Sequence, residues 1–102
     1  MDNMRYIKEL ADNIMEEVED AKKYAEKSLE HKAWGDSYAA SRYHQLAEDE
    51  LSHASFLHEL VTKQIKKLGE VYTPPAEMME KWEKAHKEYV EKTAWIKQML
   101  NM

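Results

Sequence analysis

Apolar residues recur at three- and four-residue steps through three long stretches of the chain, which is the spacing of one face of a helix. From this pattern we place helices at about residues 2–32, 37–68 and 75–100. Two glycines and two prolines leave little material for the turns that join strands. The 102 residues therefore predict one all-α domain spanning 1–102, with a long antiparallel helical hairpin followed by a shorter third helix.

The breaks between the stretches carry residues that commonly end and begin helices. Gly35 suits the left-handed conformation at a helix C-terminus, and Asp36 or Ser37 can cap the helix that follows. Because this break is short, the two flanking helices are expected to pack as antiparallel neighbours. Thr73 and Pro74 are expected to supply the cap and the first-turn proline of the third helix. The pattern leaves open whether that helix packs on its own hairpin or on a neighbouring chain.

The charge balance narrows the classes of partner. The formal net charge is −5 and basic residues are scattered among acids, which argues against a nucleic-acid surface. No cysteine is present, which excludes disulfides and thiolate metal sites. No apolar run approaches the roughly 20 residues of a membrane span. The N-terminal MDNMRYIKEL lacks the apolar core of a signal peptide, so we expect a cytoplasmic location.

One polar pair interrupts the apolar face of the second helix. Glu50 and His53 are three residues apart, so both project from the same side of the helix. That side is otherwise apolar or aromatic, and its members are Tyr43, Leu46, Leu57 and Leu60. A carboxylate and an imidazole in such a stripe are costly unless they have a partner. A metal ion is one such partner.

Counting outward from the hairpin turn identifies a third polar residue at the same height. His53 lies eighteen residues after Gly35, and Glu17 lies eighteen residues before it. In an antiparallel hairpin the two positions are therefore neighbours on adjacent helices. Ile14 and Ala21 bracket Glu17 one turn away on either side, so its carboxylate is aimed inward.

Two carboxylates and one imidazole, with no sulfur, favour iron or manganese, and zinc is also compatible. Di-iron helix bundles use two single glutamates and two Glu-x-x-His pairs. This hairpin supplies one of each, which is half of such a site. A two-fold dimer of hairpins would complete a four-helix bundle with four glutamates and two histidines around two metal ions.

The Glu-x-x-His spacing is a weak motif by itself. Fifteen glutamates among 102 residues give about one such match to five histidines by chance, and two are present. The second match, Glu83 and His86, has no evident partner glutamate and predicts a surface pair. His44 and His58 are likewise expected to be surface or interface histidines. For the first match, the alternative interpretation is a group of interfacial polar residues that pair with one another or with lysines.

The segments MEEVEDAKKY and AEDELSHA resemble the ferritin-like superfamily and are most similar to the encapsulated ferritins. These are two-helix proteins whose ferroxidase centre forms between two subunits. The matching positions are Met15, Glu16, Glu17, Val18, Glu19 and Tyr24 in the first helix, and Glu50, His53 and Ala54 in the second. The resemblance spans roughly residues 10–65.

The resemblance implies a role for each matching polar residue. Glu17, Glu50 and His53 would be iron ligands. Tyr24 would hydrogen-bond a ligand carboxylate without binding the metal itself. Glu16 and Glu19 would attract incoming metal. It also implies a homo-oligomer that oxidises Fe(II) to Fe(III) with dioxygen or peroxide, for iron storage or detoxification. An encapsulin shell is an implied partner, and the shell lumen an implied location, although the chain contains no segment resembling an encapsulin-targeting tail.

Three other functions remain compatible with the sequence. The first is a rubrerythrin-like di-iron protein that reduces peroxide, although the cysteine-ligated iron domain typical of that class has no counterpart here. The second is a structural helical bundle without catalysis. The third is a zinc or manganese site without redox turnover.

Overall fold

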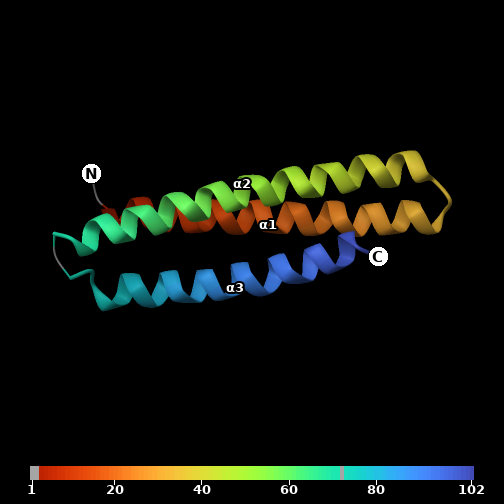
Figure 1. Ribbon diagram of the computed structural model, residues 1–102. Helices are drawn as coiled ribbons and strands as arrows, with labels where there is room; N and C mark the ends of the chain where they lie inside the picture. The colour runs from red at the N-terminus through yellow and green to blue at the C-terminus, as the bar shows by residue number, and fades with distance from the viewer. Residues whose placement is uncertain (1–2, 72) are drawn as a thin grey trace.

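The computed structural model describes residues 3–71 and 73–102, and within them every regular element is a helix. Helix α1 spans Asn3–Ala33, α2 spans Ser37–Gly69 and α3 spans Ala76–Leu100 (Figure 1). Helices α1 and α2 form an antiparallel hairpin, and α3 returns in the direction of α1. The all-α fold and its three predicted helices are confirmed. The predicted helix start at residue 2 lies outside the described residues.

The hairpin turn has the structure that its sequence predicts. Gly35 has φ = 80°, the left-handed conformation that glycine adopts without strain. The Gly35 N–H donates to the carbonyl of Lys32 at 3.1 Å, and the Asp36 N–H donates to the carbonyl of His31 at 2.9 Å. These two bonds form a Schellman motif that closes α1. The Asp36 carboxylate then caps α2 by accepting from the Ala39 N–H at 3.0 Å.

Helix α3 begins within one residue of its predicted start, but its predicted cap is wrong. The residue that precedes α3 is Pro75, and no side chain makes a capping hydrogen bond there. Pro75 has an extended ψ of 139°, which turns the chain into the helix without a hydroxyl cap. Thr73 therefore does not cap α3, and Pro74 lies outside the first turn.

The two long helices pack along a seam of regularly spaced residues. On α2 the buried residues are exactly one heptad apart, namely Ala40, Ala47, Ala54, Val61 and Leu68. Facing them on α1 are Ile7, Leu10, Ile14, Val18, Ala21 and Ala25. On both helices the small residues lie toward the turn and the large ones toward the open end. A seven-residue repeat keeps the same stripe of α2 buried along the length of the hairpin.

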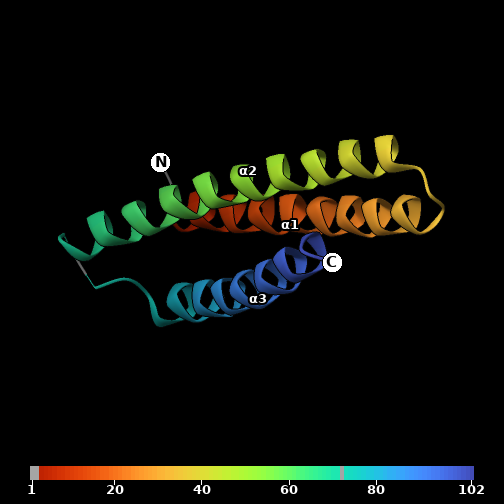
Figure 2. The same ribbon diagram turned by 45° about the vertical axis from the view of Figure 1, so that its right-hand side comes forward.

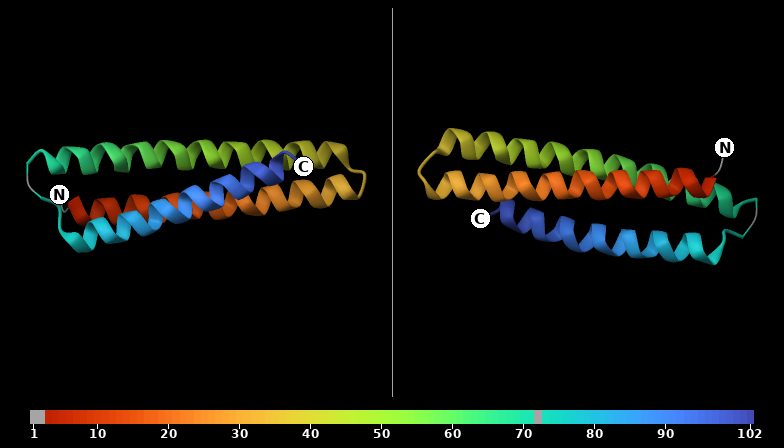
Figure 3. Two further views of the ribbon diagram at one scale, coloured as in Figure 1. Left: turned by 60° about the horizontal axis from the view of Figure 1, so that its bottom comes forward. Right: turned by 180° about the vertical axis from the view of Figure 1, so that it is seen from behind.

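Helix α3 lies obliquely across its own hairpin and packs mainly on α1 (Figures 2 and 3). Its buried residues are Met78, Ile96 and Met99. A charge-assisted hydrogen bond from Lys92 Nζ to Glu19 Oε1, at 2.6 Å, joins α3 to α1. The structure therefore places the third helix on its own hairpin.

None of the described helices combines the length and apolar character that crossing a bilayer requires.

We expect enlargement of the seam to destabilise the hairpin. Ala54 has no exposed surface, so Ala54→Leu inserts volume where the two helices touch. Its expected cost is about 1–3 kcal/mol of unfolding free energy. The exposed Ser41→Leu on the same helix is the control and should change stability by less than about 0.5 kcal/mol. Urea unfolding followed by circular dichroism measures both, and equal effects would contradict a tight seam.

Candidate metal centre

Three potential metal ligands meet midway along the hairpin. Glu17 comes from α1, while Glu50 and His53 come from successive turns of α2. One ligand atom from each of the three lies within 4.8 Å of the other two. The juxtaposition deduced by counting from Gly35 is therefore confirmed. The identity of what these residues bind stays a prediction.

The distances among the three side chains are compatible with joint coordination of one ion and with ion pairing of His53 to the two carboxylates. His53 Nδ1 is 3.6 Å from Glu17 Oε2 and 3.8 Å from Glu50 Oε2. Both separations exceed the range of a hydrogen bond. Two donor atoms each about 2.1 Å from one ion lie up to about 4.2 Å apart. A protonated imidazole would therefore form an ion pair with both carboxylates, and all three groups lie close enough to share one ion.

The cluster opens to the molecular surface on one side. The exposed fraction of the side chain is 20% for Glu50, 30% for Glu17 and 61% for His53. The carboxylates are partly shielded by the hairpin, whereas the imidazole projects outward. An ion held here would keep coordination positions that face away from the hairpin. A further ligand can therefore approach from outside the chain.

The open side of the cluster is the hairpin face that α3 does not cover. Glu19, which bonds Lys92 of α3, lies about 160° around α1 from Glu17. His58, which contacts α3, lies about 140° around α2 from His53. Figures 1 and 3 show α3 on one side of the hairpin only. The candidate metal centre and α3 therefore occupy different faces.

Tyr24 lies one heptad from Glu17 and is half-buried in the hairpin. Its ring stacks on Tyr43 with 6.2 Å between centroids, and Tyr43 in turn stacks on His31 at 5.3 Å. Among the described residues, no hydrogen bond joins Tyr24 to Glu17. A hydrogen bond from Tyr24 to a ligand carboxylate therefore stays a prediction, whereas the stacking of Tyr24 on Tyr43 within the hairpin is observed.

The two neighbouring acids predicted to attract metal differ in their surroundings. Glu16 is exposed on α1. Glu19 accepts the hydrogen bond from Lys92, which holds the pKa of the Glu19 carboxyl below its usual value. The same bond raises the pKa of Lys92. The Glu19 carboxylate is thus engaged in holding α3, and attraction of metal by either acid stays a prediction.

The sequence interpretation missed a histidine pair between α2 and α3. His58 Nε2 and His86 Nδ1 are hydrogen-bonded at 2.8 Å. The exposed surface pair predicted for His86 with Glu83 is thus replaced by a contact with another helix. A signal was available, because positions 58 and 86 are each fourteen residues from the centre of the connector at position 72. The same counting that located Glu17 would have paired them.

The chain matches no known protein family, no curated sequence and no solved structure. The case for a metal centre therefore rests on the geometry and donor chemistry of Glu17, Glu50 and His53.

We expect Glu19→Gln to weaken the contact between α1 and α3. Both partners are over 40% exposed, so the loss should be below about 1 kcal/mol and should shrink in high salt. The lowered pKa of Glu19 means that this stabilisation is complete above the usual carboxyl value of 4.5 and disappears as pH falls through the lowered value. Because the pKa of Lys92 is raised, the ion pair keeps contributing to stability until the pH is strongly alkaline.

Urea unfolding at neutral and at strongly acidic pH measures this difference, with Glu16→Gln as the control for charge alone. An equal loss of stability at both pH values would contradict an ion pair. Weakened metal binding in Glu19→Gln but not in Glu16→Gln would assign Glu19 to the metal centre instead.

Proposed function

We propose that this chain is a ferritin-like di-iron protein that oxidises Fe(II) to Fe(III) between two subunits. The observation that carries the proposal is the convergence of Glu17, Glu50 and His53, whose ligand atoms lie within 4.8 Å of one another. The resemblance of the surrounding segments to encapsulated ferritins supports the same assignment. The reaction would serve iron storage or detoxification.

The donor set supports iron as the metal. Carboxylate oxygens and an imidazole nitrogen, without sulfur, bind Fe(II) and also suit manganese or zinc. The two negative charges of Glu17 and Glu50 offset the charge of a divalent ion and continue to favour it when it becomes trivalent. Fe(II), as the substrate, gives up one electron per ion, which dioxygen or peroxide accepts. His53 contributes a neutral nitrogen ligand, so protons compete with metal for this position.

Pairing of two hairpins would bring two half-sites together. The open face that carries the cluster also exposes Leu46, whose exposed fraction is 41%, and leaves Leu57 and Leu60 only half-buried. A two-fold axis through this face would place the same apolar residues against one another. The partner hairpin would also supply ligands for the coordination positions that face away from each hairpin. The resulting bundle would contain four long helices with α3 on the outside.

Iron oxidation tests the reaction directly. After anaerobic loading with Fe(II), addition of air or peroxide should produce ferric absorbance in the wild type. We expect Glu50→Ala/His53→Ala to slow this oxidation more than about tenfold, because each half-site loses two of its three ligands. The matched control is His44→Ala/Glu48→Ala, which removes another paired histidine and glutamate from α2 at 2.8 Å separation. The control should oxidise iron normally.

Equal rates in the wild type and in Glu50→Ala/His53→Ala would refute the proposal. Faster turnover with peroxide than with dioxygen would favour the rubrerythrin-like alternative. Zinc or manganese that elemental analysis finds in the wild type but not in Glu50→Ala/His53→Ala, without ferric absorbance, would indicate a site without redox turnover. Absence of metal binding at Glu17, Glu50 and His53 would favour the alternative of a structural helical bundle without catalysis.

The paired assembly is tested separately by sedimentation velocity with and without iron. We expect metal-loaded wild type to form dimers or larger oligomers, and Leu46→Arg to weaken that association by introducing charge into the apolar face. Val90→Arg is the control, since Val90 is an aliphatic residue on α3 whose exposed fraction, 50%, is similar to that of Leu46. A metal-loaded wild type that oxidises iron as a monomer would contradict the shared site.

A further inference from the structure

The histidine pair between α2 and α3 presents a second set of potential metal ligands. One hydrogen atom is shared between His58 Nε2 and His86 Nδ1, which are 2.8 Å apart. Both nitrogens therefore lie between the two helices, and each ring points its nitrogen toward the other ring. This pair lies on the α3 side of the hairpin, away from the open face that carries Glu17, Glu50 and His53.

Aromatic neighbours hold the His58 ring in place. Tyr89 stacks on it with 4.6 Å between centroids, and Trp82 lies 5.4 Å from it at a tilt. Both rings come from α3, so the histidine is fixed by the same helix that supplies His86. Partial burial and the proximity of His86 lower the pKa of His58. A neutral imidazole is the form that binds metal.

The separation of the two nitrogens is near that of two ligands on one ion. Two nitrogens each about 2.05 Å from a metal lie about 2.9 Å apart at a right angle and about 3.3 Å apart at the tetrahedral angle of Zn²⁺. The observed 2.8 Å is therefore close to the right-angle value and about 0.5 Å short of the tetrahedral one. Binding of one ion by both nitrogens requires the bridging proton to move to the other nitrogen of its ring, and both rings to rotate so that the two nitrogens face the ion. His86 is exposed, so an ion can reach the pair from solvent.

We propose that His58 and His86 form a second metal site, selective for divalent ions that prefer imidazole, such as Zn²⁺ and Ni²⁺, and that the bound ion fastens α3 to α2. Among the described residues, no further carboxylate or histidine donor completes a group of three around this pair. Water therefore fills the remaining coordination positions. The purely nitrogen donor set distinguishes this site from the carboxylate-rich cluster on the open face.

The test uses the full chain carrying Glu50→Ala/His53→Ala, so that the candidate iron centre cannot contribute. Zn²⁺ binding is measured by calorimetry, and Ni²⁺ binding by quenching of tryptophan fluorescence, because Trp82 adjoins His58. In this background we compare His86→Ala with His44→Ala. His44 is the matched control because it also joins α2 to α3, through the carbonyl of Leu100 at 3.1 Å. Circular dichroism without metal verifies that each variant is folded.

We expect saturable Zn²⁺ binding in the background chain, weakened at least about tenfold by His86→Ala and unchanged by His44→Ala. Ni²⁺ should quench fluorescence in the background chain and in His44→Ala, but not in His86→Ala. Zn²⁺ should also raise the melting temperature only where it binds. Absence of saturable binding in the background chain, or binding that persists unchanged in folded His86→Ala, would overturn the proposal. Neither result would bear on iron oxidation by the chain with an intact open-face cluster.

Discussion

Close contact between α1 and α2 is the constraint on which the rest of the structure depends. The distance between packed helices is set by the side chains at their contact, and small residues bring the axes together. Ala21 and Ala25 on one helix and Ala47 and Ala54 on the other are all fully buried along the seam. Glutamate and histidine side chains have limited reach, so ligands from both helices meet only because the backbones approach closely. The seam thus determines the geometry of the candidate metal centre.

Much of this arrangement follows from the sequence because the hairpin contains no irregular element. Both long helices are uninterrupted, and the turn at Gly35 is closed by hydrogen bonds that leave it one conformation. Equal counting from the turn therefore identifies neighbours in space, which is why Glu17 could be paired with His53. The seven-residue repeat also fixes which side of each helix is buried. The distance of each residue from the turn, together with the side of the helix on which it lies, was sufficient to predict that the three residues meet.

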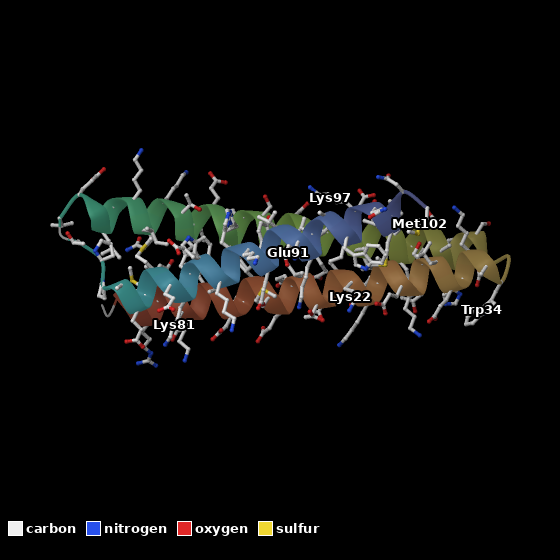
Figure 4. All side chains as sticks on the ribbon, turned by 90° about the horizontal axis from the view of Figure 1, so that it is seen from below. Lys22, Trp34, Lys81, Glu91, Lys97 and Met102 are labelled. Carbon is white, nitrogen blue, oxygen red and sulfur yellow. The ribbon has the colours of Figure 1, made fainter. Side chains whose placement is uncertain are left out.

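The surroundings of α3 were less predictable, for physical reasons. The connector before it is irregular, and Pro75 begins the helix without the side-chain cap that Thr73 led us to expect. The apolar stripe of α3 is broad, so it does not specify which neighbouring helix each residue faces. The contacts of Lys92 with Glu19 and of His86 with His58 depend on that orientation. Figure 4, viewed from below, shows α3 in front of the hairpin, while Trp34 projects from the turn.

The shortness of the turn between α1 and α2 has a kinetic consequence. Closing a small loop costs little conformational entropy, and helical proteins dominated by local contacts are among the fastest to fold. All three ligands of the open-face cluster belong to this one hairpin. Their convergence is therefore a first-order event whose rate does not depend on protein concentration. A newly made chain would present its carboxylates and imidazole as a preformed group before it encountered another molecule.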